Sequence, residues 1–439
     1  MFKQVAPLST IIALRFFGLF IVLPTISIYA ISLPGSSTTI VGLVIGGYAI
    51  TQMVFQIPFG AISDKIGRKT TITIGLLVFA AGSVVSAMAN DINMLIAGRF
   101  LQGAGAIGAV VTAMISDLVV EHKRTKAMAI MGGMIAGSFA LAMILGPLIG
   151  ASYGIGTLFY ITAFLSILSI VLLYTIVPNP PKTVHDYHNK AKLIPLLFDK
   201  NLFKMNITNM LQKSFMTFVF MISPIVLIQN YGWNKMDMVY LYLPAMIAGV
   251  LAMGPAAMIA EKRGKYKEVL IIGVAFFAVS FGFFGFFSGA EFFITGVVLF
   301  FVGFNMHEPI MQSVAVKFSK TYQKGLTLGV FNSFGYFGTF TGGVAGGYLY
   351  DSIGLQSLSF VVVILSVLWL VMLISLTNPK KLRTIYIKNS LIDKTNLDRL
   401  NYSTMPIQEW YENETENIIV VKFYEDKTDE QYIKKAIML

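Results

Sequence analysis

The chain has no cysteine and few charged residues. Without cysteine, neither a disulfide framework nor a thiolate metal site can form. Charged residues make up 13% of the 439 residues and hydrophobic residues 56%. In a soluble globular protein, about 25% of the residues are charged and about 45–50% are apolar. The sequence also lacks a Gly-x4-Gly-Lys-Ser/Thr loop, the motif that binds the phosphates of ATP, so an activity driven by ATP is not indicated. No catalytic constellation is visible, and we expect neither an enzyme nor a bound metal or cofactor.

Long apolar runs dominate the sequence instead. Each run is near the ~20 residues that a helix needs to cross a bilayer, and a few polar or turn residues bound it. A β-barrel would show short segments of alternating polarity, so we expect an all-α membrane bundle. Twelve spans are predicted, at approximately 8–32, 38–62, 71–89, 93–119, 127–151, 157–177, 205–229, 236–260, 268–288, 292–316, 326–350 and 357–377.

The net charge of +11 could indicate a nucleic-acid partner, but its distribution argues against one. The whole excess lies before residue 378, because the remaining residues carry ten basic and ten acidic side chains. Basic residues gather in alternate loops, at 65–69, 123–126, 182–204, 262–267 and 317–324, while the opposite loops carry only Lys235. Since basic loops stay on the cytoplasmic side, both termini are predicted to be cytoplasmic.

A proline-rich polar connection divides the spans into two sets of six. The predicted organisation is a first six-helix half at 1–177, a cytoplasmic linker at 178–204, a second half at 205–377 and a cytoplasmic tail at 378–439. Mixed charge and proline in the linker argue against a further span.

The tail has a different character from the rest of the chain. Alternating β-branched and aromatic residues predict strands at about 383–387, 407–411 and 417–423, and helices fit about 393–402 and 429–437. Thr428 and Gln431 form a plausible capping box for the second helix. This order is that of a small α/β ferredoxin-like unit without its last strand. At ~60 residues its core is modest, so docking or self-association is expected.

The most specific motif is the charged turn at 60–72, GAISDKIGRKTTI. It resembles the signature loop of the major facilitator superfamily, Gly-x-Leu-Ala-Asp-Arg-x-Gly-Arg-Lys, at Gly60, Ile62, Ser63, Asp64, Lys65, Gly67, Arg68 and Lys69. The resemblance implies a twelve-helix transporter with a cavity between two halves. It also implies a latch between this loop, Asp117 at the end of span four and the start of span eleven. Our hypothesis is that the latch locks the outward-open state; the alternative is a solvated basic loop.

Two further signatures lie in spans four and five. GRFLQGAGAIGA resembles the second family signature and contains Arg99 and Gln102. A guanidinium inside a span costs at least ~2.5 kcal/mol, so Arg99 should face a cavity or a partner, with snorkelling to the interface as the alternative. The fifth span resembles the antiporter signature at Gly133, Gly146, Pro147 and Gly150, with departures at Ala142 and Ala151. Plain helix packing is the alternative for this motif.

Embedded charged residues are the candidates for proton coupling. His307 and Glu308 lie well inside the tenth apolar run, Lys213 lies in the seventh and Arg15 in the first. Desolvation would favour the neutral carboxyl of Glu308, which is what a proton-driven carrier needs. The alternatives are a structural ion pair between Glu308 and Lys213, and snorkelling of Arg15 to the interface.

The resemblance covers nearly the whole chain. The segments LRFFGLFIVLP, TQMVFQIPFGAISDKIGRK, RFLQGAGAI, RTKAMA, AMILGPLIG and FVGFNMHEP, together with the tail, resemble the YajR-type transporters. This group implies proton-driven efflux of small amphipathic or drug-like molecules across the bacterial inner membrane. Proton-coupled uptake of a nutrient and a membrane solute sensor are the competing interpretations.

Overall fold

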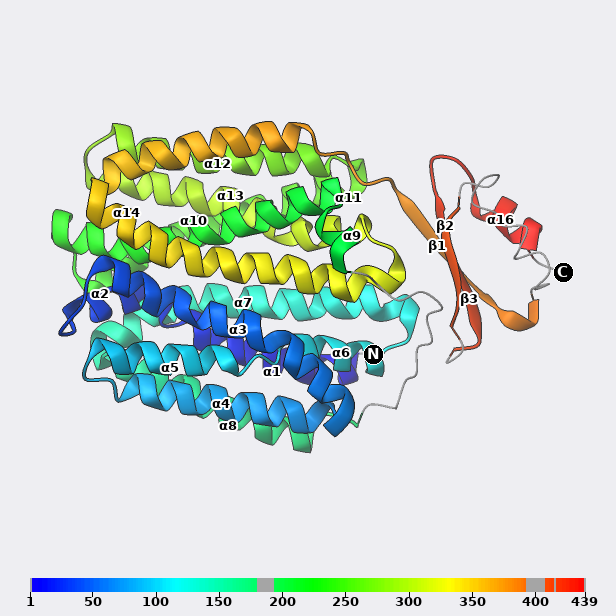
Figure 1. Cartoon of the computed structure of the whole chain (residues 1–439), viewed down its shortest axis with the longest axis horizontal. Helices are drawn as coiled ribbons and strands as arrows, with labels where there is room; N and C mark the ends of the chain where they lie inside the picture. The colour runs from blue at the N-terminus through cyan, green and yellow to red at the C-terminus, as the bar shows by residue number, and fades with distance from the viewer. Residues whose placement is uncertain (1, 180–192, 392–406, 414–415, 438–439) are drawn as a thin grey trace.

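The computed structural model describes residues 2–179, 193–391, 407–413 and 416–437. Long α-helices form a bundle, and a small β-sheet lies beyond one end of it (Figure 1). The N-terminus and the sheet lie at this same end, which we call the terminal face. We call the other end of the bundle the opposite face.

The first group of helices contains two broken spans. Its members are α1 (Phe2–Phe20), α2 (Leu23–Ser32), α3 (Thr38–Ile66), α4 (Arg68–Ala87), α5 (Ile92–Ala104), α6 (Gly108–Leu118), α7 (Glu121–Tyr153) and α8 (Ile155–Thr175). Pro24 in the first turn of α2 has no N–H to donate, which fits the break after α1. The break between α5 and α6 begins at Gly105, where a Cβ atom would lie 2.4 Å from the carbonyl oxygen of Gly75.

The second group ends in a helix that folds back on itself. Its members are α9 (Leu193–Leu197), α10 (Lys200–Tyr231), α11 (Met238–Arg263), α12 (Tyr266–Phe286), α13 (Ala290–Lys317) and α14 (Lys324–Ile374), with short 3₁₀ turns at Lys235–Asp237 and Thr321–Gln323. Gly354 interrupts α14 with a φ of 73°, a left-handed value that favours glycine. Figure 1 shows the two arms of α14 running in opposite directions from this point.

The apolar runs predict the spans well, with two differences. In the described part of the chain, eleven helical stretches are long and apolar enough to cross a bilayer, and the last, Thr321–Ile374, has 54 residues. At 1.5 Å per residue, one bilayer needs only ~20 of them, so this stretch corresponds to the predicted spans eleven and twelve. The predicted loop at 351–356 is therefore a single break at Gly354. Helix α10 begins at Lys200, inside the segment predicted as a linker.

The small sheet has the strand order β1-β3-β2, with both neighbours antiparallel. Its elements are β1 (Leu382–Lys388), β2 (Ile407–Asn413), β3 (Ile418–Tyr424) and α16 (Glu430–Ile437), with a 3₁₀ turn at Asn389–Leu391. A central third strand is what a ferredoxin-like unit without its last strand requires, so the tail's fold agrees with the prediction. The helix predicted at 393–402 lies outside the described residues.

The cap of α16 differs from the prediction. Its first turn is capped by Asp429, whose Oδ1 accepts a hydrogen bond from the N–H of Tyr432 at 2.7 Å. Asp429 is one residue further along than Thr428, so the proposed box of Thr428 with Gln431 is wrong. A carboxylate also interacts favourably with the positive end of the helix dipole, which favours Asp429 as the cap.

Aromatic rings fill the core of the second group. Phe277 stacks on Trp369 with their ring centroids 5.7 Å apart, and it contacts Phe300 at 5.0 Å. These rings join α12, α13 and the second arm of α14. The sheet has a separate core, in which strand residues such as Val421 and Phe423 pack with Ile433 of α16.

Candidate transport site and its latches

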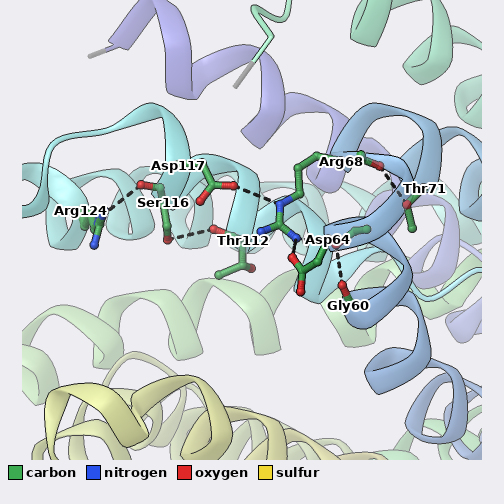
Figure 2. Close-up of polar contacts among 10 residues, drawn as sticks. Gly60, Asp64, Arg68, Thr71, Thr112, Ser116, Asp117 and Arg124 are labelled. Carbon is green, nitrogen blue, oxygen red and sulfur yellow. Dashed lines mark hydrogen bonds and ion pairs between the residues drawn. The ribbon is translucent and has the colours of Figure 1, made fainter. Parts of the chain in front are cut away.

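The charged turn after α3 is organised by Arg68. Its Nε donates to Asp117 Oδ2 at 3.0 Å, and its Nη1 donates to Asp64 Oδ1 at 2.5 Å and to Ser63 Oγ at 2.5 Å. Figure 2 shows this guanidinium between the two carboxylates. Gly67 separates α3 from α4 with a φ of 95°, which puts Arg68 at the first position of α4. We call Asp64, Arg68 and Asp117 the first latch.

The first latch does not reach α14. Among the described residues, the Asp64 carboxylate has a hydrogen bond to Arg68 and to no residue of α14, and 66% of its side chain is exposed. A Cβ atom added at Gly60 would meet nothing within 4 Å, and the same holds at Gly325 near the start of α14. The structure thus assembles the part of the predicted latch within the first group and leaves its contact with span eleven unmade.

The second group carries a counterpart in the matching loop, where the sequence keeps a faint echo of the signature but singles out no residue. Glu261 near the end of α11 accepts hydrogen bonds from Ser313 Oγ at 3.0 Å, Lys317 Nζ at 3.0 Å and Tyr266 Oη at 2.7 Å. These residues come from the ends of α11, α12 and α13, which match the positions of α3, α4 and α6 in the first group. We call Glu261, Tyr266 and Lys317 the second latch. The segment AEKRGK is the trace of this counterpart in the sequence. Its Glu261 takes the place of the signature's aspartate, which is Asp64 in the first group.

The two groups are packed tightly at the opposite face. A Cβ atom at Gly42 of α3 would lie 1.9 Å from the carbonyl oxygen of Gly343 of α14, so these backbones touch. The backbone N–H of Thr39 donates to Asp351 Oδ2 at 3.2 Å, one turn nearer the opposite face. The groups are thus in backbone contact at this face, whereas Gly60 near the first latch and Gly325 near the start of α14 have open space around them.

An ion pair lies in the middle of the second group. Lys213 Nζ of α10 is 3.0 Å from Glu308 Oε1 of α13, and Gln212 Nε2 donates to Glu308 Oε2 at 3.2 Å. The Lys213 and Glu308 side chains are 23% and 40% exposed. Charges at this depth are too costly to face lipid, so this pair lines a space that water reaches. The ion pair of Glu308 with Lys213, which the sequence offered as the alternative to proton coupling, is therefore present.

A polar chain connects the two groups near their centre. Arg15 Nη2 of α1 donates to Gln52 Oε1 at 3.2 Å, and Gln52 Nε2 donates to the Tyr336 hydroxyl of α14 at 2.7 Å. Arg15 is 1% exposed and lies over the ring of Phe79, with its guanidinium carbon 5.0 Å from the ring centroid. Arg15 therefore does not snorkel to the interface. Gln52 and Tyr336 were absent from the predicted coupling set because neither carries charge.

Arg99 and Gln102 are fixed inside the first group. Arg99 Nε donates to the carbonyl of Val44 at 3.0 Å, and its Nη1 donates to Gln102 Oε1 at 2.7 Å. Gln102 Nε2 in turn donates to Ser83 Oγ at 2.8 Å. Both side chains are fully buried. They tie α5 to α3 and α4, and the structure does not bring them to Glu308.

His307 is turned away from the ion pair although it precedes Glu308. Its Nε2 lies 2.8 Å from the carbonyl oxygen of Leu270 of α12, and its ring contacts Phe277 and Trp369 at 5.5 and 5.8 Å. The side chain is fully buried in the aromatic core. Neighbouring helix positions point about 100° apart, which explains why the two residues face different surroundings.

The antiporter motif divides into close contacts and open positions. A Cβ atom at Gly146 would lie 2.3 Å from the carbonyl oxygen of Ile21, at the break between α1 and α2. At Gly150 it would lie 3.2 Å from Leu158 and Thr25, whereas at Gly133 it would meet nothing within 4 Å. Pro147 lies within α7 beside this contact. Gly146 thus lets α7 approach the broken first span closely.

A small cavity lies between the two groups of helices. Its volume is about 10 Å³, room for about one water molecule. It is lined by Leu23, Ile45, Tyr48, Met216, Thr217, Phe220 and Thr339, from α2, α3, α10 and α14. These lining residues belong to no sequence motif, so the sequence alone could not assign them to a cavity.

The arrangement is that of a secondary transporter: two helical groups in close backbone contact at one face, with charged and polar residues near their centre. The sequence profile of the Major Facilitator Superfamily matches residues 8–318 and 245–397. The chain belongs to this superfamily and is a multi-pass membrane transporter rather than an enzyme.

Particular relatives narrow this assignment. The inner membrane transport protein YajR of Escherichia coli K12 is 36% identical over 377 residues, which cover 85% of this chain and 83% of YajR. The quinolone resistance protein NorA of Staphylococcus aureus N315 is 31% identical over 212 residues, 47% of this chain and 53% of NorA. Among solved structures, a D-xylose–proton symporter superposes with a TM-score of 0.70 at 15% identity, covering 87% of this chain and 99% of the symporter. That last likeness concerns the fold alone.

Proposed function

We propose that this protein exports small amphipathic or drug-like molecules in exchange for protons, by alternating access. The terminal face is then cytoplasmic, as the basic loops predict, and the structure corresponds to the inward-open state. Similarity to YajR, an inner membrane transport protein, and to NorA, a quinolone resistance protein, supports location and direction.

The observation that carries the proposal is the exposed ion pair of Glu308 and Lys213. The Glu308 side chain is 40% exposed, and an ammonium group holds it at 3.0 Å; in this proposal water reaches it from the cytoplasmic side. A proton taken up by the carboxylate would remove this attraction and free Lys213. Glu308 is thus the proton carrier, and substrate and proton compete through the charge of this pair.

Proton flux in proteoliposomes tests this role. We expect Glu308→Gln to abolish the response of transport to an imposed pH gradient, because an amide cannot bind or release the proton. Glu291→Gln, at the other end of the same helix, is the matched control and should leave the response intact. A Glu308→Gln protein whose transport followed the gradient normally would refute the assignment.

The first latch holds the alternative, outward-open state in this proposal. When the cytoplasmic face closes, the exposed Asp64 carboxylate meets the start of α14. Its negative charge then interacts favourably with the positive end of that helix dipole. Arg68 and Asp117 position it through their contact within the first group.

Proton-coupled uptake is the rival function. The positively charged Arg15 lies near the centre. Two of its guanidinium nitrogens, Nε and Nη1, have no hydrogen-bond partner in the described part of the chain, which would suit an anionic nutrient. Right-side-out vesicles separate the two functions: an inward proton gradient depletes the substrate in export and accumulates it in uptake.

A further inference from the structure

The small sheet has two faces of different chemistry. Side chains alternate between the faces of a strand, and one face packs on α16 through the core around Val421 and Phe423. The other face carries polar and aromatic residues that contact the helical bundle. We call this second set the docking face: Tyr386, Glu409, Tyr411, Asn413 and Lys422.

The docking face is anchored to the second group of helices. The backbone N–H of Thr321, just before α14, donates to both carboxylate oxygens of Glu409 at 3.0 Å. Lys422 lies 2.8 Å from the same carboxylate and also contacts the Thr321 hydroxyl. The connection to the sheet is held as well, since the backbone N–H of Lys267 donates to Asn378 Oδ1 at 2.8 Å.

The same face also reaches the first group, at the start of α7. The Glu121 carboxylate accepts a hydrogen bond from Asn413 Nδ2 at 2.8 Å and another from the Tyr411 hydroxyl. Its backbone N–H donates to Glu416 Oε1 at 2.7 Å. The next residue, His122, contacts the ring of Tyr386 with centroids 5.9 Å apart. The sheet therefore bridges the two groups at the terminal face.

From this geometry we propose that the docked sheet is a brace that holds the transporter in its inward-open state. Alternating access requires the two groups to rock against each other, so the starts of α7 and α14 must change their relative position. A body bound to both starts in one arrangement stabilises that arrangement by the difference in its binding free energy. The tether keeps the sheet at high local concentration, so few contacts suffice.

Glu121 is the contact through which the brace can be released. The sheet and its connection are tied to the second group at several points, and on the first group Glu121 bonds to the sheet through both its backbone N–H and its carboxylate. The inference rests on the alternation assumed in the proposed function.

Distances between the groups test the brace without measuring transport. Because the chain has no cysteine, two introduced cysteines are the only sites that a thiol-reactive spin label modifies. We place them at the exposed positions Lys65 and Lys265 on the terminal face. In the full chain in lipid nanodiscs, we expect one dominant long distance. Glu121→Ala removes a carboxylate that accepts two hydrogen bonds, so it should raise the population with a short distance by at least about fivefold, the shift that loss of one good hydrogen bond produces.

The matched control is Glu291→Ala, since Glu291 also lies in the first turn of its helix but at the opposite face. It should leave the distances unchanged. Tyr411→Phe removes only a hydroxyl in the sheet, and we expect it to act in the same direction as Glu121→Ala and non-additively with it. This second variant leaves every membrane helix intact.

A label pair at Lys126 and Lys388 reports docking itself. If Glu121→Ala releases the sheet by this measure and the distance between the groups stays as in the wild type, the brace is overturned while alternation stands. If the sheet stays docked in the double variant, the assigned contacts do not hold it. A single unchanged distance between the groups in every protein, with substrate and pH gradient varied, would overturn alternation together with the brace.

Discussion

Arg68 and Arg99 are kept inside the bundle by different partners. Arg68 lies between two carboxylates and a hydroxyl at the terminal face, and its charge is compensated there. Arg99 lies deep in the first group and donates to a backbone carbonyl and an amide oxygen, with the ring of Tyr48 4.8 Å away. Both sites use the planar fork of the guanidinium, which lysine does not have.

The two carboxylates of the first latch should respond differently to neutralisation. Asp64 is 66% exposed, so Asp64→Asn should change the free energy of unfolding by no more than about 1 kcal/mol. Its transport rate should nevertheless fall, because the outward-open state loses its latch. Asp117 is 15% exposed, and Asp117→Asn should destabilise the protein by about 1–3 kcal/mol.

Thermal unfolding in detergent and transport in proteoliposomes measure both effects. Normal transport by Asp64→Asn would show that this carboxylate has no part in alternation.

Single residues were predictable where a motif or a charge marked them. The resemblance paired Arg68 with Asp117, and depth in a span singled out Glu308. The contact between Gln52 and Tyr336 was not predicted because it spans 284 positions and joins uncharged side chains. Glu261 was missed because its loop keeps little of the signature, although its surroundings repeat the first latch.

Helices α3 and α14 meet through small residues. Along this contact Gly42 faces Gly343, and a Cβ atom at Gly46 would lie 2.8 Å from the carbonyl oxygen of Thr339. Glycine at these positions lets two backbones touch, which close packing in a bilayer favours. The contact forms the closed side of the transporter.

A single methyl group should therefore disturb this closed side. Gly42→Ala puts a Cβ atom 1.9 Å from a backbone oxygen, so the helices must separate, at a cost of about 1–3 kcal/mol. We expect increased labelling of cysteines introduced near Thr39 from the opposite face. The control is Gly329→Ala in α14, where the added Cβ atom meets nothing within 4 Å. Equal labelling in both variants would contradict the close approach.

Elements were predictable where composition alone decides them. An apolar run must be helical in a bilayer, so the spans followed from the sequence to within a few residues. The break at Gly105 did not follow, because this glycine is set apart only by the carbonyl of Gly75 that it contacts; the reversal at Gly354 fell inside the predicted loop at 351–356, but its left-handed backbone was not marked by the sequence. Strand positions followed from alternation, but the partner of the polar face could not be predicted from the strands alone.

A charge pair within the sheet, with low exposure, contacts the bundle at Thr321. Glu409 and Lys422 are 8% and 10% exposed. Burial alone would raise the pKa of Glu409, but the Lys422 ammonium and the hydrogen bonds from Lys422 and Thr321 outweigh it and hold the pKa below its ordinary value of 4.5. The carboxylate is therefore ionised throughout the physiological range.

The pH dependence of docking follows from this direction. A lowered pKa contributes stability that is complete above the ordinary value and is lost as the pH falls through the lowered one. The distance between labels at Lys126 and Lys388 should thus stay constant from about pH 8 to about pH 5 and lengthen only below about pH 4.5. Release of the sheet between pH 5 and 7 would contradict this assignment and indicate a different titrating group.

The position of the docking face along the chain has a consequence for biosynthesis. Glu409 contacts a residue 88 positions earlier, and Asn413 contacts one 292 positions earlier. Both surfaces must already be inserted in the membrane and correctly oriented when the sheet leaves the ribosome. Docking can therefore form only when both groups are inserted in the same orientation, and a chain with one misinserted half would leave the docking face uncovered.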